Sequence, residues 1–222
     1  MKTDPAHNLP GVITSITPQK KNKERYSVFV DEVFLIGVSD STLLNFGLAK
    51  GVVMTPSLFK KLQRAEGRHA VKSYLFMLLG RRDHARQELL DKAKRKDYPP
   101  EIIEDVLDEL EQKGFINDRQ FAEKFAVDKS TLNKWGPVKI RSHLVRKGIS
   151  NHDISRSIDR AFEHLELKET FLNLVLKKKR RFLREEDPLK RKKKILDYLC
   201  RRGYKPETVF KYLDELTEAI SE

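Results

Sequence analysis

The sequence has little of what a disulfide-bonded or membrane-spanning protein needs. It holds one cysteine, Cys200, in 222 residues, which excludes an internal disulfide. The longest apolar run, residues 74–79, is far shorter than the roughly 18 to 20 residues that span a bilayer. Residues 1–12 contain no apolar stretch like the core of a signal peptide. We therefore expect a cytoplasmic protein that does not enter a membrane.

Motifs of catalysis and of cofactor binding are also missing. The sequence has no glycine-rich phosphate loop, no G-x-S-x-G, no H-E-x-x-H and no C-x-x-C. Its six histidines, at positions 7, 69, 84, 143, 152 and 164, include no pair four residues apart, the spacing of a helical metal site. We therefore expect no enzymatic activity, no metal and no cofactor.

What the sequence has in excess is positive charge. Lys and Arg number 45 against 33 Asp and Glu, a formal net charge of +12. Residues 166–205 hold fifteen of the cations and six acids, which leaves +9 in this one stretch. Ten of the fifteen lie in two blocks, 177–181 and 190–194, which we expect to project from two consecutive amphipathic helices. Such a basic strip is typical of proteins that bind phosphate backbones or acidic protein surfaces. A solvated face without a partner is the alternative.

The first 55 residues differ in pattern from the rest. Runs of β-branched and aromatic residues at 12–16, 26–30 and 33–38 predict a small β-hairpin or meander. Ser39 predicts the N-cap of a short helix that ends near Phe46. Because two or three strands alone are only marginally stable, we expect this region to pack on the next part of the chain.

An internal repeat organises the remainder. Residues 95–110 and 201–216 agree at eight of sixteen positions without a gap, and a middle copy gives offsets of 51 and 55 between the three. A period near fifty, filled by short amphipathic helices, is typical of a supersecondary unit repeated in tandem. We predict a mainly α fold: a β-rich segment at 1–55, then an elongated, curved array of three three-helix, helix-turn-helix-like repeats. We place them at 56–114 (which includes a linking helix), 115–165 and 166–222.

Single residues of the array carry their own expectations. Trp135 is expected to be a core or joint residue, with stacking on a base or on a partner as the alternative. Tyr98 and Tyr204 occupy the same place in two turns and are predicted to be structural. Gly148 is expected to adopt a turn conformation that only glycine takes easily. Cys200 aligns with an aliphatic position, so it is expected to be a small buried side chain rather than a nucleophile.

Residues 144–158 also have the spacing of a DNA-binding helix-turn-helix. Its second helix would present Ser155, Arg156 and Ser157 outward, a small surface for reading bases. The repeat alone explains the same spacing, so we regard this signal as weak.

About 80 residues in the middle of the chain, from the end of the first long helix through the second repeat, carry a resemblance to a known family. LGRRDHARQEL at 79–89, then Leu107-x-x-Leu110 with GFINDRQFA at 114–122, then a pattern of glycine, isoleucine and leucine that ends in Lys147-Gly-Ile149, resemble the regulatory protein RecX family. The positions that carry the resemblance are Arg82, Glu88, Leu89, Asp118, Phe121, Ala122, Gly136, Ile140, Leu144, Lys147, Gly148 and Ile149. One departure is Ala85, where many members have serine.

This resemblance implies tandem three-helix units that bind the RecA recombinase filament in its helical groove. It implies a modulating, usually inhibitory, effect on recombination and ATP hydrolysis, in the setting of DNA repair and the SOS response, and requires no catalysis. We expect a monomer whose basic face meets the filament and contacts single- or double-stranded DNA. The expected contact residues are Arg82, Lys139, Arg141, Arg146, Lys147, Lys177, Lys178, Lys179, Arg180, Arg181, Lys190, Arg191, Lys192, Lys193, Lys194, Arg201 and Arg202.

The alternative is a nucleic-acid-binding module that acts without RecA. It would be either a non-specific single-strand binder or a helix-turn-helix regulator. A base-reading protein would prefer one duplex sequence, a non-specific binder would prefer none, and a RecA modulator would need the filament to show its effect.

Overall fold

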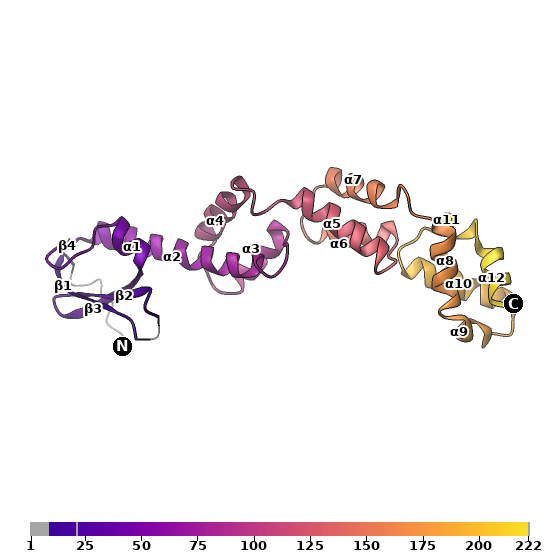
Figure 1. Cartoon of the computed structure of the whole chain (residues 1–222), viewed down its shortest axis with the longest axis horizontal. Coiled ribbons are helices and arrows are strands. Elements are labelled where there is room, and N and C mark those ends of the chain that lie inside the picture. Colours follow the sequence, from indigo (N-terminus) through magenta and orange to yellow (C-terminus); the bar gives the residue numbers. More distant parts are fainter. Residues whose placement is uncertain (1–8, 21, 222) are drawn as a thin grey trace. The chain divides into compact units, whose positions relative to one another are not determined.

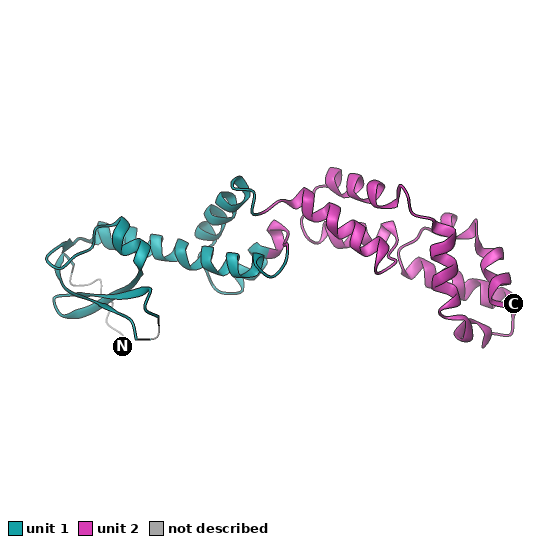
Figure 2. Ribbon diagram, in the orientation of Figure 1, with its two compact units in different colours: residues 1–82, 89–115 teal, residues 83–88, 116–222 magenta. Residues whose placement is uncertain are grey.

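The structure is a computed structural model that describes residues 9–20 and 22–221 (Figure 1). It confirms the mainly helical fold predicted from the sequence, with a small strand region at the N-terminal end. The outermost residues of the predicted first and third segments, 1–8 and Glu222, lie outside the described residues. The chain forms two compact units, one of residues 1–82 and 89–115 and the other of residues 83–88 and 116–222 (Figure 2).

The N-terminal strands form one antiparallel sheet. Strands β1 (Gly11–Pro18), β2 (Arg25–Val30) and β3 (Val33–Ser39) make the predicted meander, and a short fourth strand, β4 (Val53–Met54), pairs with β1. The strand order is β3-β2-β1-β4. Asp31 and Glu32, the two residues between β2 and β3, both have positive φ, as a tight hairpin turn requires.

The sheet packs on the neighbouring helices α1 and α2, as the instability of isolated strands predicts. Ser39 caps α1 (Asp40–Asn45), and Thr55 caps α2 (Pro56–Leu79), which sends Phe59 and Leu62 into the core of the sheet. Glu66 of α2 accepts hydrogen bonds from the Ser39 backbone N–H at 2.7 Å and from its hydroxyl at 3.0 Å. Burial alone would raise the pKa of Glu66, but the hydrogen bonds from Ser39 and Thr42 and the Arg25 guanidinium lower it.

The rest of the chain is a series of short helices in the order of the repeat. The last helical segment of each repeat begins at Pro100, Asn151 and Pro206, which are separated by the offsets of 51 and 55 found in the sequence. In the third repeat this segment is divided into two short helices. The helices after α2 are α3 (Arg86–Lys94), α4 (Pro100–Gln112), α5 (Asp118–Thr131), α6 (Pro137–Val145), α7 (Asn151–Phe162), α8 (Leu167–Leu176), α9 (Lys179–Leu183), α10 (Pro188–Arg201), α11 (Pro206–Phe210) and α12 (Leu213–Ser221). Among the residues that the structure describes, no helix is both long enough and apolar enough to cross a membrane.

In each repeat, the turn before this last helical segment places one residue in the left-handed region. Asp97, Gly148 and Gly203 have φ of 57°, 76° and 97°, so the expectation for Gly148 is confirmed. In the third repeat Tyr204 comes next, buried and 4.7 Å from the Phe171 ring, and its hydroxyl donates to a backbone carbonyl at 3.3 Å. Burial raises the pKa of Tyr204 to about 12. The structural role predicted for this tyrosine is therefore confirmed.

The third repeat differs from the prediction in one respect. The sequence pattern placed residues 177–181 inside an amphipathic helix, but α8 ends at Leu176 and α9 begins only at Lys179. Lys178 between them has φ of −117° and ψ of 11°, outside the helical range. Five consecutive cations repel one another at the three- and four-residue spacings of a helix, which favours a break at this point. The basic block therefore covers the turn between the two helices and the first three residues of α9, and we call it the cationic turn (residues 177–181).

Candidate binding surface

The second and third repeats meet through their backbones. The Gly136 N–H donates to the Arg202 carbonyl at 2.8 Å, and the Val138 N–H donates to the Gly203 carbonyl at 3.0 Å. A Cβ on Gly136 would overlap the Gly203 backbone, so the approach needs glycine here. The Arg202 side chain adds a hydrogen bond of 2.7 Å to the Asn133 carbonyl. These bonds place the side chains around the joint in fixed positions.

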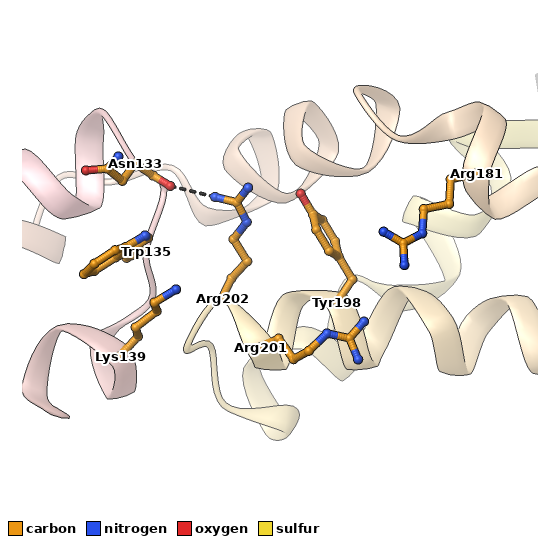
Figure 3. Close-up of a pocket in the computed structure, with 7 residues that line it drawn as sticks. All are labelled: Asn133, Trp135, Lys139, Arg181, Tyr198, Arg201 and Arg202. Carbon is orange, nitrogen blue, oxygen red and sulfur yellow. Dashed lines mark hydrogen bonds between the residues drawn. The ribbon is translucent and has the colours of Figure 1, made fainter. Parts of the chain in front are cut away.

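A cavity of about 670 Å³ opens at this joint, and we call it the joint groove (Figure 3). Trp135 and Lys139 line it from the second repeat (Figure 3). The third repeat supplies three arginines and a tyrosine, so the complete lining is Asn133, Trp135, Lys139, Arg181, Tyr198, Arg201 and Arg202. An adjoining hollow of about 260 Å³ shares Arg181, Tyr198 and Arg201 with it and adds further cations, Lys178, Arg184 and Lys194.

Trp135 is half-buried at the start of α6 and contacts the core of the second repeat, which confirms its expected place at a joint. The Lys139 ammonium lies 4.4 Å from the centre of its ring, and the His143 ring is 4.6 Å away. Lys129 approaches the same ring at 5.5 Å. Trp135 is thus surrounded by cationic groups and still lines the groove.

The joint carries an uncompensated positive potential. Burial lowers the pKa of His143, and the charges of four cations, Arg146, Lys139, Lys147 and Lys129, lower it further. Among the described residues, four cations and no carboxylate thus affect the protonation of this histidine. An anion placed here would therefore be attracted.

The cationic turn is the part of the basic strip with the most available charge. Within residues 9–20 and 22–221, the five side chains of this turn form no ion pair and no hydrogen bond. They line a hollow of about 620 Å³ together with Leu176, Leu183 and Arg184. Arg181 also lines the joint groove, so the two hollows share a residue.

The second predicted block, residues 190–194, is largely engaged within the repeat. Lys192 pairs with Asp214 and Lys194 with Glu185, both at 2.5 Å. The Arg191 guanidinium donates to the Glu185 carbonyl at 2.9 Å. Lys190 lies 3.9 Å from Asp187, one turn away. These contacts leave Lys193 as the member of this block whose side chain has no partner among the described residues.

The predicted residues of the second repeat also have internal partners. Lys147 pairs with Glu88 at 2.5 Å, with the two side chains 19% and 18% exposed, and lies over the Phe121 ring at 5.5 Å. Arg141 donates to the Ser155 hydroxyl at 3.0 Å. Arg146 donates to the Ser142 carbonyl of its own helix. A role of these three in binding a partner stays a prediction, although Lys147 already uses its charge inside the fold.

Arg82 lies apart from this set. It is exposed in the turn after α2, between the end of that helix and the start of α3. Its predicted role stays a prediction.

The base-reading surface expected of a helix-turn-helix is contradicted in one position. Ser157 was expected to point outward but is 1% exposed, because it lies on the same helical face as Ile154 and Ile158. Ser155 is half-buried and accepts the hydrogen bond from Arg141. Only Arg156 of the three is fully exposed.

The sequence did not single out three residues that line these hollows, Asn133, Tyr198 and Arg184. Tyr198 lies one turn of α10 before Arg201 and Arg202, and that spacing was the available signal. Arg184 lies three positions after the cationic turn. Cys200, by contrast, is half-buried, and burial raises the pKa of its thiol. No cluster of His, Cys, Asp and Glu able to hold a metal occurs in the part of the chain that the structure describes.

Four family models cover most of the chain in order. They are the regulatory protein RecX N-terminal domain at residues 11–55, and the RecX first, second and third three-helix domains at 72–110, 117–158 and 166–213. The match therefore includes the N-terminal sheet and each of the three repeats.

Individual relatives agree with these models. The chain is 30% identical to the regulatory protein RecX of Listeria monocytogenes over 210 residues, which are 95% of this chain and 76% of that protein. It is 29% identical to that of Clostridium acetobutylicum, covering 92% of this chain and 95% of that one. A crystal structure of regulatory protein RecX superposes with a TM-score of 0.73 at 25% identity, over 92% of this chain and 99% of the other. A second, from Lactobacillus salivarius, shares the fold with a TM-score of 0.55 at 22% identity, over 68% of this chain and 98% of the other. The chain belongs to the regulatory protein RecX family.

Proposed function

We propose that this protein binds the filament of the RecA recombinase as a monomer, lies in its helical groove and inhibits recombination and ATP hydrolysis. It acts in the cytoplasm by occupying the filament rather than by catalysis. The observation that carries the proposal is the charge of the cationic turn, which forms no ion pair with any residue that the structure describes, in a chain of this family. Several weak contacts, from more than one repeat, would add through effective concentration.

The contacts we propose fall into two groups. The cationic turn and the joint groove supply most of the attraction, because their charges are not neutralised within the fold. Arg82, Arg141, Arg146 and residues 190–194 contribute less, because ion pairs or hydrogen bonds occupy most of them. Where the filament exposes DNA, the same cations meet phosphates.

The proposal is tested by single-strand-dependent ATP hydrolysis of RecA. The protein is titrated at ratios well below one per RecA, at two salt concentrations. We expect hydrolysis to fall at these low ratios, and the effect to weaken at the higher salt because the contacts are electrostatic. Unchanged hydrolysis, with naked DNA still bound, would instead assign the protein to the nucleic-acid binders that act without RecA.

A charge-reversal pair connects the effect to the cationic turn. Replacing Lys177, Lys178 and Lys179 by glutamate is expected to abolish the inhibition at moderate salt while the helices remain folded. The matched control replaces Lys94, Arg95 and Lys96, another run of three exposed cations at the end of a helix, and keeps the inhibition. Equal inhibition by both variants at physiological salt would remove the cationic turn from the binding surface.

A further inference from the structure

The second repeat contacts residues 83–88 of the first repeat at one joint, the first joint, and the third repeat at the other, the second joint. These two joints hold different charges at corresponding positions. The offset of 51 relates Glu88 to Lys139, and the offset of 55 relates Lys147 to Arg202. At the first joint Glu88 and Lys147 form an ion pair. At the second joint the corresponding residues are two cations, and both line the joint groove. The second joint therefore lacks the carboxylate that neutralises the first.

The missing negative charge is not supplied by neighbouring residues. Every charged side chain that lines the joint groove is a cation: Lys139, Arg181, Arg201 and Arg202. The Arg202 guanidinium donates to a backbone carbonyl, which satisfies one N–H and leaves its charge in place. A ligand with negative charge would complete this joint as Glu88 completes the other.

The groove also contains two aromatic side chains. Trp135 and Tyr198 line it together with the cations (Figure 3). Rings beside a basic groove are typical of sites where the unstacked bases of a single strand lie against aromatic faces and the phosphates meet Arg and Lys. In a duplex the bases are stacked inside the helix and offer no free face. An acidic peptide would use the cations and leave the rings without a role.

The cations extend further than one phosphate needs. The adjoining hollow adds Lys178 and Arg184, along with Lys194, which is paired with Glu185, and shares Arg181 and Arg201 with the groove. A row of cations of this kind fits consecutive phosphates of a polymer rather than a free nucleotide. Arginine is suited to the task because its planar guanidinium can donate two hydrogen bonds to one phosphate.

The geometry points to the joint groove as a binding site for a single-stranded polynucleotide. Lys139, Arg181, Arg201 and Arg202 hold its phosphates. Its bases take the places over the Trp135 and Tyr198 rings that the Lys139 ammonium and the Arg202 guanidinium, at 4.4 Å and 5.5 Å from the ring centres, hold in the free protein. The site deepens the proposed function, on which it rests for a DNA contact inside the filament. Because binding is measured here on nucleic acid without RecA, its failure is distinguishable from failure of the ATPase experiment above.

The test uses the full chain and a short fluorescently labelled oligothymidylate. Lys139→Glu restores at the second joint the acid that the first joint has, so that Arg202 gains an ion-pair partner. We expect this variant to remain folded, with an unfolding temperature at or above that of the unchanged protein, and to bind the oligonucleotide roughly tenfold more weakly. Lys211→Glu, an equal charge change on an exposed residue outside the groove, should keep most of the affinity.

Two further readouts separate this site from general attraction. Trp135 is the only tryptophan, so its fluorescence should change when the oligonucleotide binds. Lys139→Glu should also lower the slope of log affinity against log salt by about 0.7, the value for one phosphate contact on a single strand. Equal weakening by Lys139→Glu and Lys211→Glu, or tighter binding of a duplex of the same length, would overturn the proposal. So would an acidic peptide that binds the groove when the oligonucleotide does not.

Discussion

The first joint of the second repeat is held by side chains, whereas the second joint is held by the backbone. At the first, Asp118 accepts from the Arg86 N–H at 2.8 Å and Glu88 pairs with Lys147. At the second, the backbone N–H groups of Gly136 and Val138 donate to the carbonyls of Arg202 and Gly203. Once a joint closes largely through its backbone, no ion pair between its side chains is needed for assembly. The cations of such a joint can then attract a negatively charged partner, because no carboxylate among the described residues of the joint neutralises them.

The largest effect is expected from glycine substitutions that break the second joint. A Cβ on Gly203, at φ 97°, would lie 2.5 Å from the Lys139 backbone nitrogen, so Gly203→Ala forces both strain and collision. We expect a loss of about 3 kcal/mol or more in the free energy of unfolding. Chemical denaturation followed by circular dichroism measures it.

Two other glycines serve as matched controls for that loss. Gly148→Ala, at φ 76° and with the Gln87 Cβ at 3.0 Å, is expected to cost about 2 kcal/mol. Gly114→Ala, at φ 75° with no neighbour within 4 Å, should cost only the backbone strain of about 1 kcal/mol. Three equal losses would show that the close approach at the second joint contributes nothing beyond its φ angle.

A smaller effect is expected from breaking the ion pair of the first joint. Lys147→Met keeps an unbranched side chain on the Phe121 and Phe125 rings but removes the ammonium group that pairs with Glu88. Since both partners are mostly shielded from solvent, we expect a loss of about 1 to 2 kcal/mol, between the values of exposed and fully buried pairs. Thermal unfolding measures it.

The control for this variant is an exposed pair in the same unit. Lys124 and Asp83 lie 2.7 Å apart with their side chains 57% and 60% exposed. Lys124→Met should therefore change stability by less than about 0.5 kcal/mol. If both lysine variants cost the same, the half-buried pair has no special role in the first joint.

The contrast between the joints also shows what the sequence could and could not supply. The repeat, its offsets and the glycine of the turn could be predicted from local pattern, because a left-handed residue and a helix start leave a signature within a few positions. Ser39 as an N-cap is of the same kind, and the structure confirms it. The two blocks of positive charge could likewise be identified from the sequence alone.

Pairing of those charges was not visible, because the partners are distant along the chain. Lys147 finds Glu88 59 residues away, and Lys192 finds Asp214 22 residues away. From the sequence, residues 177–181 and 190–194 were therefore predicted to bind a partner equally well. The fold separates them: Asp214 and Glu185 engage members of the second block, while the charges of the cationic turn have no ion-pair partner among the described residues. Tyr198 was missed for the same reason, since only folding brings it beside Trp135 in one groove.

The smallest effect is expected from a paired charge in the first unit, the carboxylate of Glu109. Glu109 of α4 accepts hydrogen bonds from Lys113 and Lys72, both at 2.6 Å, and these bonds lower its pKa from 4.5 to about 2. A carboxyl whose pKa is lower in the folded state binds protons more readily when unfolded, so its contribution to stability is full above pH 4.5 and is lost as the pH falls toward 2. Glu109→Gln should thus be less stable than the unchanged protein at pH 7, and the difference should shrink steadily below pH 4.5. Unfolding temperatures recorded across that range measure it, with Glu101→Gln, an exposed acid in the first turn of the same helix, as the control. A difference that does not depend on pH would mean that Glu109 stabilises α4 by its packing, and that paired charge contributes little to this unit.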